Sequence, residues 1–201
     1  PDVMILSAAD YDRCAEATEE AIAAGIGVVA IDTDVNAAGR ACFVGSISYE
    51  IGLEIGRAMA SYLPEGGKVA VIQHMLTTTT GIERTRGVLD ALNEAGNIEI
   101  LGSFCCDNST EQAQTITTEL LSADPEIRGF VCTHEVCNVG AANALVELGM
   151  GGRVYVVGCD NSQRQIQFLE QNIIQAIVTQ RPFNMGYVAV QQAVRVANGE
   201  Q

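Results

Sequence analysis

The chain has 201 residues, of which 48% are hydrophobic and 18% are charged, and it carries a formal net charge of −14. A surface this acidic repels phosphate backbones and anionic lipids, so we expect no direct nucleic-acid contact and no attachment to anionic membranes. No apolar stretch reaches the roughly 18 residues that suggest a membrane span.

Apolar runs alternate with helix-period segments along most of the chain, as in successive βαβ units. The predicted strands are Val3–Ser7, Val28–Asp32, Lys68–His74, Ile98–Cys105, Gly129–Thr133, Val154–Cys159 and Ile174–Thr179. The predicted helices are Asp12–Ala24, Ser48–Leu63, Thr80–Ala95, Ser109–Leu121, Glu135–Leu148, Ser162–Gln171 and Met185–Ala197. This alternation predicts an α/β fold with parallel sheets and right-handed crossovers.

One segment breaks the alternation. After Asp32 the chain runs through the irregular, polar stretch Thr33–Arg40 into a short strand, Cys42–Gly45, and then almost directly into the next helix. We therefore predict that Cys42–Gly45 crosses from one sheet to another instead of returning through a helix.

Polar residues gather where the predicted strands end. Asp32 ends one continuous apolar run and Asp160 ends another. Ligands of parallel sheets bind just beyond the carboxyl ends of the strands, so the two aspartates form a candidate binding pair. The alternative is that each aspartate only caps the helix that follows it, since Asp is a favoured N-cap residue.

Further polar side chains are expected at the same edge: His74, Asn108, His134, Gln180 and, from the helix after His74, Arg86. Carboxylates, an arginine, amides and an imidazole around a cleft suit a polyhydroxylated neutral ligand, because each hydroxyl can donate to Asp and accept from Arg or Gln. Each residue also has a structural interpretation. Arg86 could be a solvated helix charge paired with Glu83 or Asp90, His134 a structural histidine, and Gln180 a turn residue.

No catalytic or nucleotide-binding motif is present, and we expect no enzymatic activity, no cofactor and no metal. Gly66-Gly67-Lys68 lacks the flanking residues of a phosphate loop. The seven cysteines form no paired framework. Four of them, Cys105, Cys106, Cys132 and Cys159, lie at strand ends near His134, so a zinc or redox site is an alternative, although their spacing matches no known finger.

An ordered set of short motifs resembles the ribose-type periplasmic sugar-binding proteins, whose fold is shared with the effector domains of lactose-repressor-like regulators. The motifs are Ile31-Asp32, Val44-Gly45-Ser46, Gly66-Gly67-Lys68-Val69-Ala70-Val71-Ile72-Gln73, Glu83-Arg84-Thr85-Arg86-Gly87, Val157-Gly158-Cys159-Asp160 and Thr179-Gln180-Arg181-Pro182. The resemblance covers essentially the whole chain.

The resemblance implies two flavodoxin-like lobes joined by crossover strands. Residues 1–46 and 181–201 would form the N-terminal lobe and residues 47–180 the C-terminal lobe. The family's first two strand–helix units and its final crossing segment have no counterpart in these residues, so the first lobe is expected to be incomplete.

In the family, the positions matching Asp32, Arg86, Asp160 and Gln180 hydrogen-bond the hydroxyls of the ligand. His134 falls where relatives often carry an amide ligand. The ribose pattern has an aromatic residue in place of Asn108, another in place of Cys159, and an arginine in place of Thr33. These departures make ribose itself a doubtful ligand.

The resemblance implies a solute-binding protein that closes over a sugar-like ligand. Its partner would be a membrane permease or a signalling protein, and its location periplasmic or extracellular, with a lipid anchor as one option. The alternative is the effector-binding core of a sugar-responsive, cytoplasmic repressor of the lactose-repressor type, which the free cysteines favour mildly.

Overall fold

The computed structural model describes residues 1–200, which divide into two compact units. Unit 1 comprises Pro1–Ile47, Thr77–Thr80 and the residues from Gln180 onward, and unit 2 comprises Ser48–Leu76 and Gly81–Thr179. Thr77–Thr80 lies far from the predicted boundaries in sequence. It belongs to unit 1 because the backbone N–H of Tyr11 donates to Thr77 O over 2.9 Å, and that of Asp34 donates to Thr79 Oγ1 over 3.1 Å.

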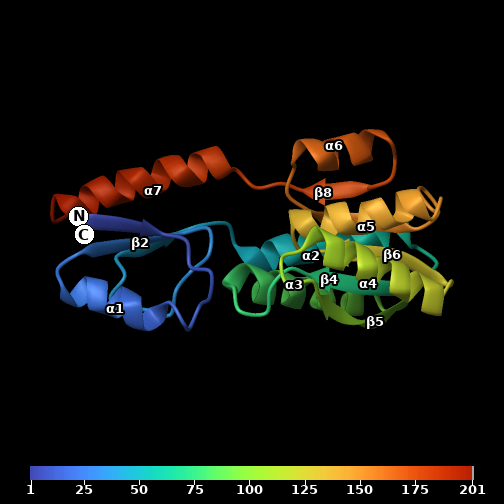
Figure 1. The fold of residues 1–201 in the computed structure, drawn as a ribbon, viewed down its shortest axis with the longest axis horizontal. Coiled ribbons are helices and arrows are strands. Elements are labelled where there is room, and N and C mark those ends of the chain that lie inside the picture. Colours follow the sequence, from blue (N-terminus) through green and yellow to red (C-terminus); the bar gives the residue numbers. More distant parts are fainter. Residues whose placement is uncertain (201) are drawn as a thin grey trace. The chain divides into compact units, whose positions relative to one another are not determined.

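Unit 1 is a three-stranded parallel sheet in the order β1 (Val3–Leu6), β2 (Gly27–Ile31) and β3 (Cys42–Val44). Helices α1 (Ala15–Ala23) and α7 (Pro182–Ala197) cover its opposite faces (Figure 1). As predicted, no helix returns between β2 and β3, and the chain enters unit 2 at Ser48 soon after β3, but the strand itself does not cross between sheets. It pairs in parallel with β2, from Val29 opposite Cys42 to Ile31 opposite Val44.

Unit 2 is a five-stranded parallel sheet with helices on both faces. Its strands are β4 (Gly67–Gln73), β5 (Ile98–Cys105), β6 (Ile127–Cys132), β7 (Tyr155–Cys159) and β8 (Ala176–Val178), in the order β5-β4-β6-β7-β8. Its helices are α2 (Ser48–Tyr62), α3 (Thr79–Ala95, whose first residues belong to unit 1), α4 (Thr110–Ala123), α5 (Glu135–Glu147) and α6 (Gln163–Glu170). The predicted α/β class with flavodoxin-like strand order is confirmed.

The apolar runs form strands because both faces of this sheet are buried. Val69 and Val71 of β4 pack in one core with residues of α2 and α3, whereas Ala70 and Ile72 pack in another with residues of α4 and α5. Consecutive strand residues point to opposite faces, so each strand must be apolar throughout. None of the helices in the described part of the chain has the length and apolarity that crossing a membrane requires.

The strand order reverses between β4 and β6, because β5 lies on one side of β4 and β6 on the other. In open α/β sheets, ligands bind beyond the carboxyl ends of the strands at such a switch point. The residues that follow β4 and β6, His74 and Thr133-His134, therefore mark the place where a site is expected.

One helix begins earlier than the sequence pattern predicted. α7 starts at Pro182 instead of Met185. Proline is favoured at the first helical position, because its missing N–H is one that the first turn leaves unpaired in any case.

Candidate functional site

Asp32 and Asp160 occupy equivalent positions in the two units. Each follows the last residue of a buried strand, and each donates its backbone N–H to the neighbouring strand: Asp32 to Val44 O over 3.0 Å, and Asp160 to Val178 O over 2.9 Å. Both residues adopt the left-handed backbone conformation, with φ of 63° for Asp32 and 74° for Asp160. A residue other than glycine rarely adopts this conformation, and such strain is concentrated at binding and active sites.

The capping interpretation is wrong for Asp160. Helix α6 is capped by Ser162, whose hydroxyl accepts from Gln165 N while the Gln165 side chain accepts from Ser162 N. The carboxylate of Asp160 instead accepts a hydrogen bond from Glu135 N, at the start of α5, over 3.2 Å. Asp160 therefore connects the ends of β6 and β7.

Two histidines stack at the switch point. The rings of His74 and His134 lie 4.6 Å apart, inclined by 27°. His74 Nδ1 lies 3.2 Å from Thr133 Oγ1, which joins the ends of β4 and β6. His134 caps α5, because its Nδ1 accepts from Val136 N. His134 Nε2 is 4.0 Å from Asp160 Oδ2, too long for a direct hydrogen bond and an ion pair only when the ring is protonated.

Arg84 lies buried beneath these residues, with only 1% of its surface exposed. Its Nη1 donates to Thr133 O over 3.0 Å, and its buried Nε has no hydrogen-bond partner within residues 1–200. Burial is the largest cause that lowers the pKa of His74 to about 3, and the nearby His134 and Arg84 contribute to the same shift. His74 is therefore neutral at physiological pH. We call His74, Arg84, Thr133, His134 and Asp160 the strand-end cluster.

Arg86, a predicted ligand residue, lies away from this cluster. Its guanidinium pairs with Glu83 and stacks 4.5 Å from the ring centre of Tyr49, on the outer surface of α2 and α3. This is the structural interpretation that the sequence left open for it. In helix α3, Arg84 shares a face with the buried residues Val88 and Leu92, four and eight positions further on.

Asn108 and Gln180 lie in loops that follow strands. Asn108 is exposed and left-handed (φ 57°), and its backbone N–H donates to His74 O over 2.8 Å, so its loop is tied to the strand-end cluster. Gln180 follows β8 by two residues and belongs to unit 1. In unit 1, the hydroxyls of Ser7 and Thr33 meet over 3.0 Å beside Asp32, at the carboxyl ends of β1 and β2.

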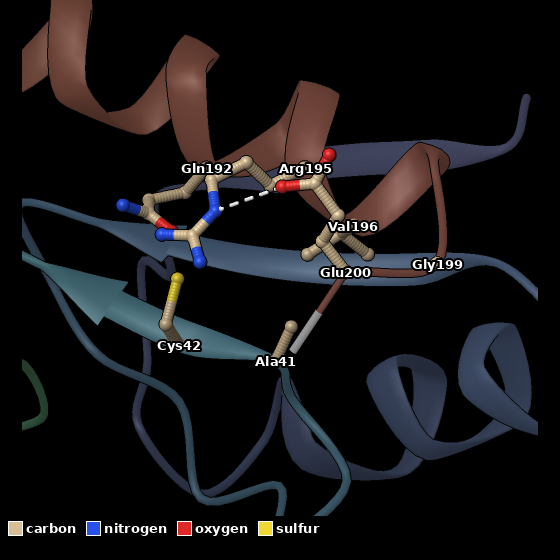
Figure 2. A pocket seen from close by; sticks show the side chains of 7 residues that line it. All are labelled: Ala41, Cys42, Gln192, Arg195, Val196, Gly199 and Glu200. Atoms are coloured by element: carbon tan, nitrogen blue, oxygen red, sulfur yellow. Dashed lines mark hydrogen bonds and ion pairs between the residues drawn. The ribbon is translucent and has the colours of Figure 1, made fainter.

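A separate hollow of about 560 Å³ lies in unit 1 under α7. Figure 2 shows the ion pair between Arg195 and Glu200 beside this hollow, with Cys42 on the facing strand. Ala41 and Cys42 stand at the amino end of β3, opposite to the edge that carries Asp32. The hollow is therefore at the edge of the sheet where binding sites of this architecture are not found.

The alternative of a zinc site finds no support in the geometry. Within residues 1–200, no three side chains of His, Cys, Asp or Glu are grouped so that they could hold a metal ion. Cys106, Cys132, Cys137 and Cys159 are instead buried among apolar residues of the sheet.

The cluster offers hydrogen-bonding groups of both kinds. Asp160 accepts, the neutral imidazole of His74 both donates and accepts, and the side chain of Asn108, in the neighbouring loop, also does both. The arrangement suits the recognition of several hydroxyls on one small molecule.

A family model described as a periplasmic binding protein domain matches residues 1–201. The D-ribose/D-allose-binding protein of Pseudomonas aeruginosa is 25% identical over 205 residues, which cover 99% of this chain and 64% of that protein. The chain thus spans less than two thirds of the length of that relative.

Two solved structures have the same fold. A sugar transporter from Clostridium phytofermentans is 30% identical, with a TM-score of 0.91 over all of this chain and 72% of the other. A periplasmic solute-binding protein of an ABC transporter from Actinobacillus succinogenes, solved with bound D-allose, is 27% identical, with a TM-score of 0.91 over all of this chain and 73% of the other.

Proposed function

The chain belongs to the family of periplasmic binding protein domains, and we propose that it binds a sugar for import by an ABC-type transporter. The observation that carries the proposal is the pair of left-handed aspartates, Asp32 and Asp160, at the ends of buried strands in the two units. Each carboxylate stands at the carboxyl end of a parallel strand, where it can accept hydrogen bonds from the hydroxyl groups of a ligand.

The strand-end cluster supports a neutral polyhydroxylated ligand more than an acid. Asp160 carries a negative charge, the neighbouring His74 is held neutral, and Arg84 is buried beneath them. A free carboxylate on the ligand would meet the charge of Asp160. An aldose offers only hydroxyls and a ring oxygen, which match the acceptors and donors of the cluster.

We propose a ligand set of Asp32, Asn108, His134, Asp160 and Gln180. Arg84 replaces Arg86 in this set. Arg86 already binds Glu83 and Tyr49, whereas the buried Nε of Arg84 lacks a partner among the described residues. A hydrogen bond from a buried charged donor is worth about 1.5–3 kcal/mol.

The named relatives guide the choice of sugars and the cellular context. D-allose is bound in the Actinobacillus protein, and the Pseudomonas protein is named for D-ribose and D-allose. We propose a hexose or pentose of this kind as ligand, a periplasmic or extracellular location, and a membrane permease as partner, with a signalling protein as the second option for the partner.

The other classes have less support. Each relative described above is a transport or binding protein, which favours neither the cytoplasmic repressor nor an enzyme. A repressor that binds the same sugar would show the same affinity but would release DNA when the sugar binds, so an operator-release assay separates the two.

The test is thermal unfolding of the full-length protein with D-allose, D-ribose, D-glucose and a sugar acid. A sugar present at about 100 times its Kd stabilises the folded state by about 2.7 kcal/mol. We expect a neutral sugar to raise the Tm and the acid to have no effect. If no neutral sugar raises the Tm, the proposal is wrong.

Substitution of Asp160 locates the site. Asp160→Asn keeps the shape of the side chain but removes the charge, so we expect sugar affinity to fall about 10- to 100-fold. The matched control is Asp90→Asn, since Asp90 accepts from the Tyr49 hydroxyl on the outer surface of the same unit. Equal loss of affinity in both variants would contradict the assignment of Asp160 to the site.

A further inference from the structure

Two cysteines meet in the core of unit 2, directly behind the loops that carry candidate ligand residues. Cys106 Sγ and Cys137 Sγ lie 3.5 Å apart, and both residues are fully buried. Cys106 follows the last residue of β5 and precedes Asn108 by two positions. Cys137 is the third residue of α5 and follows His134 by three positions.

Both sulfurs are held in place by regular structure. Cys106 N donates to Gln73 O over 2.9 Å, and Ser109 N donates to Cys106 O over 2.9 Å, so the cysteine is fixed between the end of β4 and the start of α4. Cys137 is in the first turn of a helix whose N-cap is His134. A disulfide has an S–S length of about 2.05 Å, so the two sulfurs need to approach by roughly 1.5 Å.

We propose that Cys106 and Cys137 are a dithiol pair that closes to a reversible disulfide when the protein meets a disulfide oxidant. The bond would join the β5–α4 loop, which carries Asn108, to the first turn of α5, which follows His134. Neither the geometry of the thiols nor the test below depends on the proposed function of the site.

The environment makes Cys106 the attacking sulfur. A hydrogen bond from the Cys137 thiol, aided by the backbone N–H groups of Ser109 and Asn108, lowers the pKa of Cys106 to about 7 against the effect of burial. Burial raises the pKa of Cys137 well above its ordinary value. A thiol with a pKa near the ambient pH is the most effective nucleophile in thiol–disulfide exchange.

The reaction proceeds in two exchanges with an oxidant that is itself a disulfide, such as oxidised glutathione. The Cys106 thiolate attacks one sulfur of the oxidant, forms a mixed disulfide and releases one thiolate. Cys137 then loses its proton to solvent, attacks Cys106 Sγ and releases the second thiolate. The protein loses two electrons and two protons, and the oxidant gains two electrons and becomes two thiols. Cys106 itself is buried, so the exchange requires a local opening of the loop at the exposed residues Asp107 and Asn108 beside it.

The test is peptide mapping of the folded protein after treatment with oxidised glutathione, followed by alkylation and trypsin. Cleavage after arginine yields the peptides 87–128, with Cys105 and Cys106, and 129–153, with Cys132 and Cys137. We expect one cross-linked species whose mass is that of both peptides less two hydrogens. Fragmentation should assign the bond to Cys106 and Cys137, and dithiothreitol should reverse it. No cross-link, or a bond to Cys105 or Cys132, overturns the proposal.

Single variants test the order of attack, with alanine as the replacement because buried cysteine acts as a small apolar residue. In Cys137→Ala we expect glutathione to attach to Cys106 more slowly than in the wild type, because the hydrogen bond that lowers its pKa is lost, and then to remain attached. In Cys106→Ala we expect at least tenfold slower modification of Cys137, because burial raises its pKa. The control Cys105→Ala should keep the cross-link, since the Cys105 thiol contacts His74 O and Asp107 instead. Equal rates at Cys106 and Cys137 would contradict the proposed role of Cys106.

Discussion

At the scale of single residues, His74 shows how a site can depend on a group that is not charged. The residue is 5% exposed, and its ring stacks on that of His134 and lies within hydrogen-bond distance of Thr133 Oγ1. Burial lowers its pKa to about 3, whereas an unfolded histidine titrates near 6.5. A charged His74 would repel Arg84, so protonation of the ring destabilises the cluster.

The depressed pKa of His74 predicts a loss of stability in mild acid. Between pH 6.5 and pH 3 the unfolded chain binds a proton at residue 74 and the folded chain does not, so the free energy of unfolding falls as the pH falls. From pH 7 to pH 5 this amounts to about 2 kcal/mol. In His74→Asn, which cannot titrate, this part of the pH dependence should disappear.

Urea unfolding of both proteins at pH 7, 6 and 5 measures the effect. Because all other groups are shared, the difference between the two curves isolates residue 74. Parallel curves for the wild type and His74→Asn would show that His74 titrates normally in the folded protein.

At the scale of helices, α2 and α3 approach each other through two glycines. A Cβ on Gly52 would overlap the carbonyl oxygen of Arg84, and a Cβ on Gly87 would overlap that of Tyr49. The close contact therefore lies beside the turn of α3 that carries Arg84 into the strand-end cluster. Glycine in a helix costs about 1 kcal/mol relative to alanine, and here the close packing offsets that cost.

Two glycine substitutions should have opposite effects. Gly87→Ala gains helix propensity but forces α2 and α3 apart, and we expect a net loss of about 2 kcal/mol in the free energy of unfolding. Gly186→Ala, in α7, adds a methyl group with no described atom within 4 Å and should increase stability by up to about 1 kcal/mol. Chemical denaturation measures both, and a stabilising Gly87→Ala would contradict the close contact.

At the scale of the molecule, the sequence predicted most elements because both faces of the unit 2 sheet are buried. Runs such as Val69–Ile72 have no other stable placement. It did not distinguish Arg84 from Arg86, because both lie in one helical turn and only the stripe through Val88 and Leu92 separates the buried face from the exposed one. Nor did it predict the pairing of β3 with β2, or the meeting of Cys106 with Cys137, which depend on tertiary contacts.

Acidic residues outnumber basic residues in this chain, and the two kinds are also unevenly distributed over the structure. The chain has 25 acidic residues and 11 lysines and arginines. Its single lysine, Lys68, binds Asp124 over 2.7 Å and Glu126 over 2.9 Å. In contrast, Glu111, Glu119 and Glu147 line one hollow on α4 and α5, and no basic residue is among its described lining.

This distribution predicts that removal of one negative charge raises the Tm at Glu147 and lowers it at Asp124. Glu147 ends α5, where its charge adds to the negative end of the helix dipole and to the other carboxylates of the hollow. Glu147→Gln should raise the Tm by about 1–2 °C at low ionic strength, and the gain should shrink at 0.5 M salt because exposed charges are screened. Asp124→Asn, which weakens the bond to Lys68, should lower the Tm instead. Thermal unfolding of both variants at 0.02 M and 0.5 M NaCl measures these shifts. A gain for both variants would mean that net charge alone, and not its location, governs the stability of the chain.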